Sequence, residues 1–177
     1  METHSQTLIK LIREFHVVSF AEIGVNVGNN AVTILEACYD QLRMIYLIDP
    51  YRQYNDGTMG GQDQKLWNND YQRAAERLSK WTVGRGARAH LWRVPSVSAA
   101  ERLPDYVFDL VFIDGAHDRL SVIADINAWS TKIAPRGHLA GHDFRSWPEV
   151  RPAVLDRFDE SRVTTPDPYK NIWMVQL

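Results

Sequence analysis

The stretch Val107–Asp114, which reads Val-Phe-Asp-Leu-Val-Phe-Ile-Asp, decides the fold of this chain. Apart from its two aspartates, every residue in it is apolar. A run this short and this apolar is typical of a central strand that is covered on both faces. Ligands of open α/β sheets bind beyond the carboxyl ends of the strands, and this strand ends on an acid. The stretch therefore predicts a buried central strand with a functional residue, Asp114, at its end.

Similar apolar runs and helical patterns alternate on both sides of this strand, as in βαβ units. The seven expected strands are Val17–Val25, Met44–Asp49, Arg88–Val94, Val107–Asp114, His138–Phe144, Arg162–Thr165 and Asn171–Gln176. The expected helices are Thr7–Phe15, Asn30–Tyr39, Leu66–Trp81, Val97–Arg102, Arg119–Ile133 and Glu149–Asp159. We therefore predict a Rossmann-like, doubly wound α/β fold with a mostly parallel, seven-stranded sheet.

The end of the chain is expected to reverse the direction of the sheet. A turn is predicted at Pro135-Arg136-Gly137, before the fifth strand. The last two strands are separated by Pro166-Asp167-Pro168, which is too short for a helical crossover. They are expected to form a hairpin, so an antiparallel strand would lie at the C-terminal edge.

Length and charge limit the classes of protein to consider. A chain of 177 residues suits one domain, here 1–177 with a helix inside 1–16. A net charge of −2 and a pI of about 6.3 disfavour nucleic acid and offer no polycationic face to a membrane. Cys38 is the one cysteine, and no run approaches the ~20 apolar residues of a membrane span. We expect a soluble, cytoplasmic protein; the sequence leaves a homo-oligomer open.

The loop after the first strand predicts one half of a ligand site. Gly24 and Gly28 permit a tight turn with the backbone close to a ligand, and Asn30 is a candidate N-cap whose helix would face a carboxylate. A dinucleotide site would need glycine at positions 24, 26 and 29, and Asn26 and Asn29 argue against NAD.

Asp49 closes the second strand. A carboxylate there can accept both hydroxyls of a ribose; the alternative is an aspartate that caps a helix before Pro50. Together with the glycine turn, Asp49 predicts a nucleoside site.

Four motifs then carry a resemblance to a known family. They are Glu-Ile-Gly-x-x-x-Gly from Glu22, Ile-Asp-Pro-Tyr from Ile48, Phe-Asp-Leu-Val-Phe-Ile-Asp-Gly-x-His from Phe108, and Gly-His-Asp-Phe from Gly141. In order and spacing the chain resembles the class I S-adenosylmethionine-dependent methyltransferases. It is similar in particular to the small-molecule O-methyltransferase branch with the macrolide-sugar O-methyltransferases and the cephalosporin-biosynthesis methyltransferase/hydroxylase proteins.

The resemblance implies S-adenosylmethionine as cofactor. The turn with Glu22, Gly24, Asn26, Gly28 and Asn30 would hold its methionine end. Asp49 would hold the ribose, Ser96 would lie beside the adenine, and Asp114 would also border the cofactor.

A second polar group is expected at the ends of the fourth and fifth strands. It contains Asp114, His117, His142 and Asp143. Neighbouring strands lie ~5 Å apart, and clustered carboxylates repel each other unless they are protonated or bridged by a cation. In the resembling branch Asp114 and two consecutive acids on the fifth strand bind Mg²⁺. Here the first of these two acids is His142.

We therefore expect a metal at Asp114, His142 and Asp143, with Mg²⁺ less favoured and Mn²⁺ more tenable. The alternative is that His142 faces the cofactor or the core and that no metal binds.

The predicted reaction is O-methylation of a small-molecule hydroxyl. His117 would be the base, at an ordinary imidazole pKa near ~6.5, and Asp114 would hold the metal that stabilises the developing alkoxide. Residues 51–70, with aromatics and glycines, would form a lid over the site. The alternatives are metal-independent O- or N-methylation, or a cofactor-binding domain without catalysis.

Overall fold

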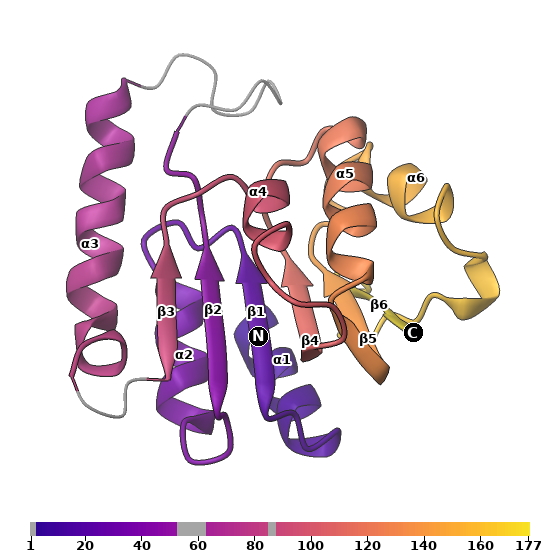
Figure 1. Ribbon diagram of the computed structural model, residues 1–177. Helices are drawn as coiled ribbons and strands as arrows, with labels where there is room; N and C mark the ends of the chain where they lie inside the picture. Colours follow the sequence, from indigo (N-terminus) through magenta and orange to yellow (C-terminus); the bar gives the residue numbers. More distant parts are fainter. Residues whose placement is uncertain (1–2, 53–62, 85–87) are drawn as a thin grey trace.

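A computed structural model describes residues 3–52, 63–84 and 88–177 of the chain, which form one α/β layered fold (Figure 1). Its sheet has six strands in the described residues, in the order β3-β2-β1-β4-β5-β6. The strands are β1 (Ser19–Ile23), β2 (Met44–Ile48), β3 (Ala89–Trp92), β4 (Phe108–Ile113), β5 (Ile133–Gly141) and β6 (Trp173–Gln176). All neighbouring pairs are parallel except β5 and β6. The predicted Rossmann-like class is confirmed.

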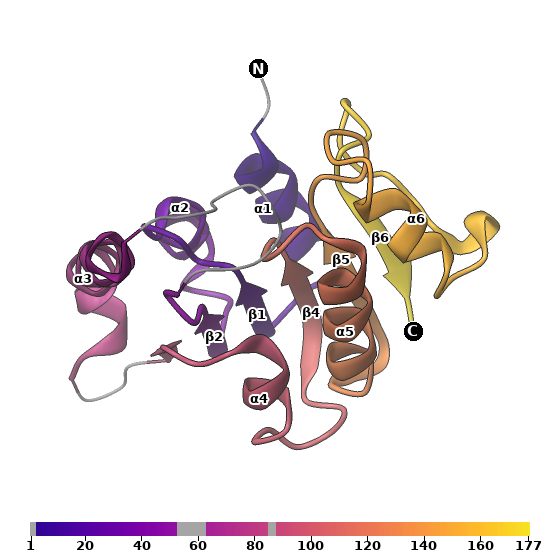
Figure 2. The ribbon, with the colours of Figure 1, turned by 90° about the horizontal axis from the view of Figure 1, so that it is seen from above.

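Helices cover both faces of this sheet. They are α1 (His4–Glu14), α2 (Asn29–Cys38), α3 (Gln64–Thr82), α4 (Ser96–Ala100), α5 (Arg119–Ser130) and α6 (Val150–Leu155), with a 3₁₀ turn at Glu160–Arg162. Seen from above, α1, α2 and α3 lie on one side of the sheet, and α4 and α5 lie on the other (Figure 2). The described helices include none long and apolar enough to cross a membrane.

The sheet is buried because its central strands are apolar on both faces. Leu110 and Phe112 of β4 pack into the core beneath α1 and α2, and Val111 and Ile113 pack into the core beneath α5. All five residues of β1 are buried as well. Successive side chains of β4 thus point alternately into the two cores, as the run Val107–Asp114 predicted. In the sheet, β4 lies between β1 and β5.

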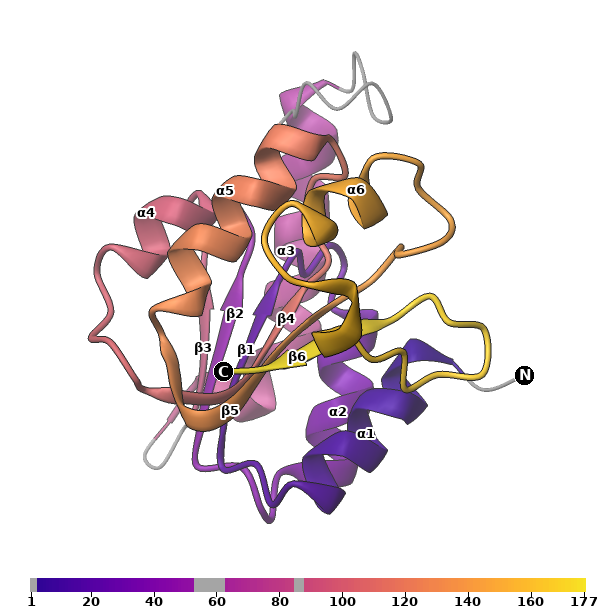
Figure 3. The same ribbon diagram turned by 90° about the vertical axis from the view of Figure 1, so that its right-hand side faces the viewer.

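The C-terminal edge differs from the prediction in one strand. The reversed strand is present as β6, but the expected strand Arg162–Thr165 is not (Figure 3). Only Thr164 pairs there, through two backbone hydrogen bonds with Met174. The 3₁₀ turn precedes this bridge, and Pro166 and Pro168, which have no N–H, follow it. The ladder cannot extend on either side, so the sheet has six strands and not seven.

Two local predictions also need correction. The N-cap of α2 is Gly28, in the left-handed region at φ 79°, and Asn30 lies inside the helix. Residues 135–137 lie within β5: Ile133 pairs with Phe108 and His138 with Leu110, so the expected turn is a bulge in a continuous strand.

Candidate active site

The carboxyl ends of β1, β2 and β4 meet at Gly24. The Gly24 N–H donates to the carbonyl of Ile48 over 2.8 Å, and the Asp114 N–H donates to the carbonyl of Ile23 over 2.7 Å. Gly24 has φ +91°, and a Cβ added to it would lie 2.0 Å from the backbone oxygen of Asp114. Only glycine fits this crossing, which brings the first predicted loop beside Asp114.

A cavity of about 500 Å³ opens at these strand ends. Its lining includes Gly24, Pro50, Ser96, Gly115 and Asp125. Two predicted cofactor residues, Gly24 and Ser96, therefore lie on its wall. Asp125, on α5, was not predicted: a single acid within a helical pattern gives no signal of its own.

Glu22 of β1 and Asn30 of α2 form a buried polar pair. Glu22 is 1% exposed, and its Oε1 accepts a hydrogen bond from Asn30 Nδ2 over 2.9 Å. Burial raises the pKa of Glu22 to about 8. Glu22 Oε2 and Asn30 Oδ1 are buried without a hydrogen-bond partner in the described part of the chain. Buried acceptors of this kind suit a ligand that brings N–H donors.

Asp49 is tied to the loop that follows β1. Its Oδ2 accepts from the N–H groups of Val25 and Asn26 over 3.0 and 2.9 Å, and its Oδ1 accepts from Tyr51 N over 2.7 Å. The Tyr51 hydroxyl in turn donates to the carbonyl of Asn26 over 2.9 Å. The structure thus gives Asp49 a positioning role that sequence reasoning missed. Because a carboxylate oxygen can accept more than one hydrogen bond, Asp49 could still bind a ribose hydroxyl, and that contact stays a prediction.

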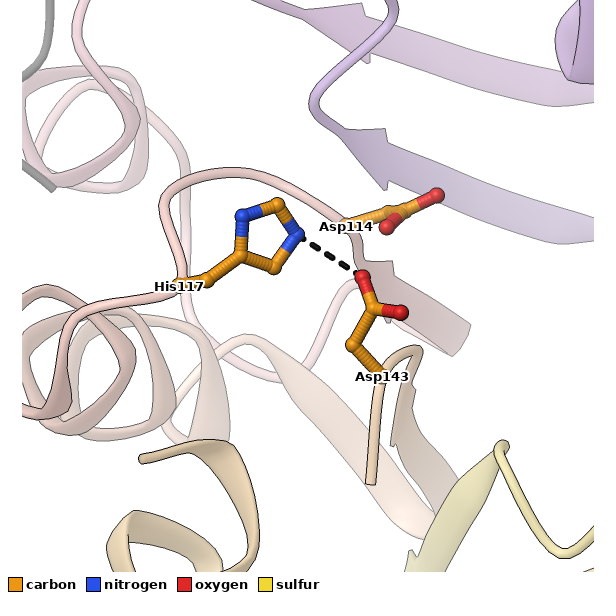
Figure 4. A group of neighbouring side chains, drawn as sticks. All are labelled: Asp114, His117 and Asp143. Atoms are coloured by element: carbon orange, nitrogen blue, oxygen red, sulfur yellow. Dashed lines mark ion pairs between the residues drawn. The ribbon is translucent and has the colours of Figure 1, made fainter. Parts of the chain in front are cut away.

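The second polar group assembles as expected from the ends of β4 and β5. Figure 4 shows His117 and Asp143 pointing toward each other, with the Asp114 carboxylate beside Asp143. His117 Nε2 lies 2.8 Å from Asp143 Oδ2. One ligand atom from each of these three residues lies within 4.8 Å of the others, a spacing that suits a metal ion.

This set differs from the predicted metal ligands in one residue. His142 Nδ1 lies 3.2 Å from Asp143 Oδ1 and 3.6 Å from Asp114 Oδ1, while its Nε2 lies 3.3 Å from Asn171 Nδ2. His142 thus borders both carboxylates, and His117 completes the compact triangle.

The charges of this group are strongly coupled. Burial raises the pKa of Asp114 to about 6. Burial would raise the pKa of Asp143 too, but hydrogen bonds from His117, His142 and Ser146 outweigh it and hold that pKa far below its usual range. Burial lowers the pKa of His142, but the hydrogen bond to Asp143 and the charge of Asp114 outweigh it and raise that pKa. Asp143 is therefore the permanent anion of the group.

Several neighbours of this group were not predicted. The Trp147 ring stacks on the His117 ring, with centroids 4.9 Å apart at 18°. His4, on α1, lies 4.9 Å from the His142 ring. The Ser146 hydroxyl donates to Asp143 Oδ1, and Asp143 itself has φ 59°. The three-residue spacing of Asp143 and Ser146 is the one turn signal that sequence reasoning had available.

The structure describes only part of the predicted lid, residues 51–70. Its residues 53–62 lie outside the described part of the chain. From Gln64 onward the segment is helical, and Trp67, which we assigned to the lid, is 4% exposed in the core. Tyr51 is fully buried. These two aromatics therefore pack the fold and do not cover a ligand.

The class of protein that this fold and site define is also found by comparison. A family model described as a methyltransferase domain matches residues 21–144, more than half of the chain. The chain therefore belongs to this methyltransferase family, as its resemblance to the S-adenosylmethionine-dependent methyltransferases implied. A search of curated proteins by sequence found no significant relative.

Solved structures share the fold at low sequence identity. A methyltransferase from Podospora anserina, PaMTH1, solved with S-adenosylhomocysteine, has a TM-score of 0.70 at 14% identity, over 99% of this chain and 79% of that one. The O-methyltransferase NovP has a TM-score of 0.67 at 16% identity, over 97% and 79%. CalS11, a TDP-rhamnose 3′-O-methyltransferase, has a TM-score of 0.67 at 13% identity, over 98% and 81%.

Proposed function

We propose that this methyltransferase transfers the methyl group of S-adenosylmethionine to a hydroxyl oxygen of a small molecule. The observation that carries the proposal is the His117–Asp143 pair beside Asp114, one loop away from the cavity of about 500 Å³. Gly115 and Ala116, between Asp114 and His117, lie on the wall of that cavity. A base and an adenosyl site would thus share one loop.

The residues at the carboxyl ends of β1 and β2 fit S-adenosylmethionine. The cofactor has an ammonium group, and Glu22, whose buried Oε2 has no hydrogen-bond partner in the described residues, would pair with it as a carboxylate after losing the proton that it holds at neutral pH. The Gly24–Gly28 turn would hold the methionine end together with Asn26 and Asn30, and Asp49 would reach the ribose. Bound there, the cofactor supplies an electrophilic methyl group. The protein must align an acceptor oxygen with it.

His117 would take the proton of the acceptor hydroxyl. Its Nε2 faces the permanent anion Asp143, which fixes the ring orientation and stabilises the ring once protonated. The Trp147 ring stacks on one face of the imidazole and restricts its rotation. Two hollows border this group: about 330 Å³ with His142 and Arg145 on its wall, and about 690 Å³ with Trp147 and Arg145. They give room for a small-molecule acceptor.

Asp114, His117 and Asp143 also fit a divalent cation, with His142 at its border. One imidazole beside two carboxylates suits Mn²⁺ better than Mg²⁺. A cation there would supply Lewis acidity toward the acceptor oxygen. A His117 ring that bound the cation through Nε2 could not also pair with Asp143 through that nitrogen, so the metal bond and the His117–Asp143 pair are alternatives.

Calorimetric titration with S-adenosylhomocysteine and with NAD tests the cofactor class. We expect saturable binding of the first and none of the second. Absence of binding to S-adenosylhomocysteine contradicts the proposal.

Chelation separates the metal-assisted reaction from the metal-independent one. Turnover of a hydroxyl acceptor found by screening is measured after EDTA treatment and after addition of Mg²⁺ or Mn²⁺. We expect a loss of turnover that Mn²⁺ restores better than Mg²⁺. Unchanged turnover would leave the His117–Asp143 pair as a base without metal.

A further inference from the structure

We infer that Asp125 accepts a hydrogen bond from the exocyclic amino group of the adenine, and so makes the cofactor cavity selective for an adenosyl compound. The inference rests on the proposed function, because it requires the cavity to hold the nucleoside end of S-adenosylmethionine. It adds a specificity-determining residue that lies on α5, outside the four motifs of the sequence.

Asp125 is a buried acid that the proposed chemistry does not use. Its side chain lies on the cavity wall although the residue is only 7% exposed. A Cβ added to Gly115, on the opposite strand-end loop, would lie 3.7 Å from Asp125 Oδ2. That oxygen therefore points toward the loop that borders the cavity. A helical acid with no function would be expected in solvent.

A hydrogen-bond relay makes Asp125 an acceptor. Trp129 Nε1 is only a donor, and it donates to Ser96 Oγ over 2.8 Å. Ser96 and Asp125 both lie on the cavity wall, and hydrogen bonding from Ser96 favours the charged form of the Asp125 carboxyl group. Burial still raises the pKa of Asp125 to about 6, so at neutral pH the group is mainly a carboxylate. Its remaining lone pairs need N–H or O–H donors.

Much of the remaining cavity wall suits a flat ring, beside the polar side chains of Arg52 and Ser121. Ile23, Val97, Ala116 and Ala124 give it apolar surface. A purine between such side chains presents its edge to the polar groups. Adenine offers an N–H donor at position 6, whereas hypoxanthine has an oxygen acceptor at that position. An acceptor such as Asp125 would bind the first and repel the second, because the oxygens would face each other without a proton.

The test compares S-adenosylhomocysteine with S-inosylhomocysteine, which differ at that position of the base. Calorimetry gives the two dissociation constants for the unaltered protein and for Asp125→Asn, an isosteric change that adds an N–H donor. The unaltered protein is expected to prefer the adenosyl compound on the order of 10-fold or more, and Asp125→Asn to lose or reverse that preference. Asp156→Asn, which changes an exposed carboxyl at the end of α6, is the control and should keep the preference.

The ratio of the two constants is measured in one protein sample, so a partly unfolded variant does not distort it. If Asp125→Asn does not fold, Asp125→Ser, which also lacks the carboxylate, should bring the ratio close to one. Tight binding of S-adenosylhomocysteine with an unchanged ratio in the variant overturns the role of Asp125 and leaves the proposed function standing. Failure of the unaltered protein to bind S-adenosylhomocysteine overturns both.

Discussion

At the scale of single residues, His117 is the side chain on which the proposed chemistry depends most. It is held by the contact of 2.8 Å between its Nε2 and Asp143 Oδ2, and by the Trp147 ring that stacks on it. The loop that carries it begins at Asp114, directly after β4. The ring is therefore positioned before any acceptor arrives, as proton transfer requires.

His117→Ala should lower kcat by about 100-fold or more, the typical share of a general base, and leave the affinity for S-adenosylhomocysteine within a factor of about two. Steady-state turnover and calorimetry measure the two quantities. His90→Ala, an exposed histidine on β3, is the matched control and should change neither. A His117→Ala variant with unaltered kcat would remove His117 as the base.

At the scale of elements, Gly24 is where the first strand leaves the sheet. Its backbone is left-handed, and its missing side chain lets the end of β4 approach. The turn after β1 and the loop of Asp114 and His117 thus depend on one contact. The two halves of the site are joined at this crossing.

Gly24→Ala should destabilise the fold by more than the backbone strain alone, because the added Cβ also meets the Asp114 carbonyl. The control is Gly84→Ala: Gly84 has φ +101°, and a Cβ added to it would meet no atom of the described residues within 4 Å, so only the strain of about 1–2 kcal/mol applies there. Urea unfolding gives both free energies. Equal losses in the two variants would contradict the close approach of β1 and β4.

The order of elements was predictable from the sequence because apolar periodicity and short connections encode it locally. The alternating pattern of β4 and the Pro-Asp-Pro segment before β6 led to the correct central strand and reversed edge. Two wrong predictions have local causes, in which a neighbouring residue overrides the preference of the predicted one. Arg162–Thr165 has the composition of a strand. The prolines that follow have no N–H to continue the pairing, so only the single β-bridge between Thr164 and Met174 forms. Asn30 is of a residue type that favours the helix N-cap, but its side-chain amide donates a hydrogen bond to the buried Glu22 instead.

At the scale of the whole molecule, the buried Glu22 couples folding to pH. A glutamate in the unfolded chain titrates near 4.5, and burial raises the pKa of Glu22 in the folded protein to about 8. Between these values the folded state binds a proton that the unfolded state lacks. Its contribution to stability is complete below pH 4.5 and is lost as the pH rises toward 8, by up to about 1.4 kcal/mol per pH unit.

Glu22→Gln removes this titration and keeps the shape of the protonated side chain. The free energy of unfolding of the variant, relative to that of the unaltered protein, should therefore become larger from pH 5 to pH 8, because only the unaltered protein loses stability over that range. Urea titrations at several pH values across that window measure the difference. A difference that stays constant with pH would show that Glu22 titrates alike in both states.

The sequence by itself determined the Rossmann-like class, the reversed edge strand, and the gathering of Asp114, His117, His142 and Asp143 at one rim. It could do so because strand ends follow from local patterns, and parallel strands align their carboxyl ends. Only the tertiary structure decided which side chains meet: His117 with Asp143, and Asn30 with Glu22. It also decided that Asp125 lies on the wall of the cavity at the strand ends. Those contacts depend on the angles and distances at which separate elements pack, and no local pattern in the chain records them.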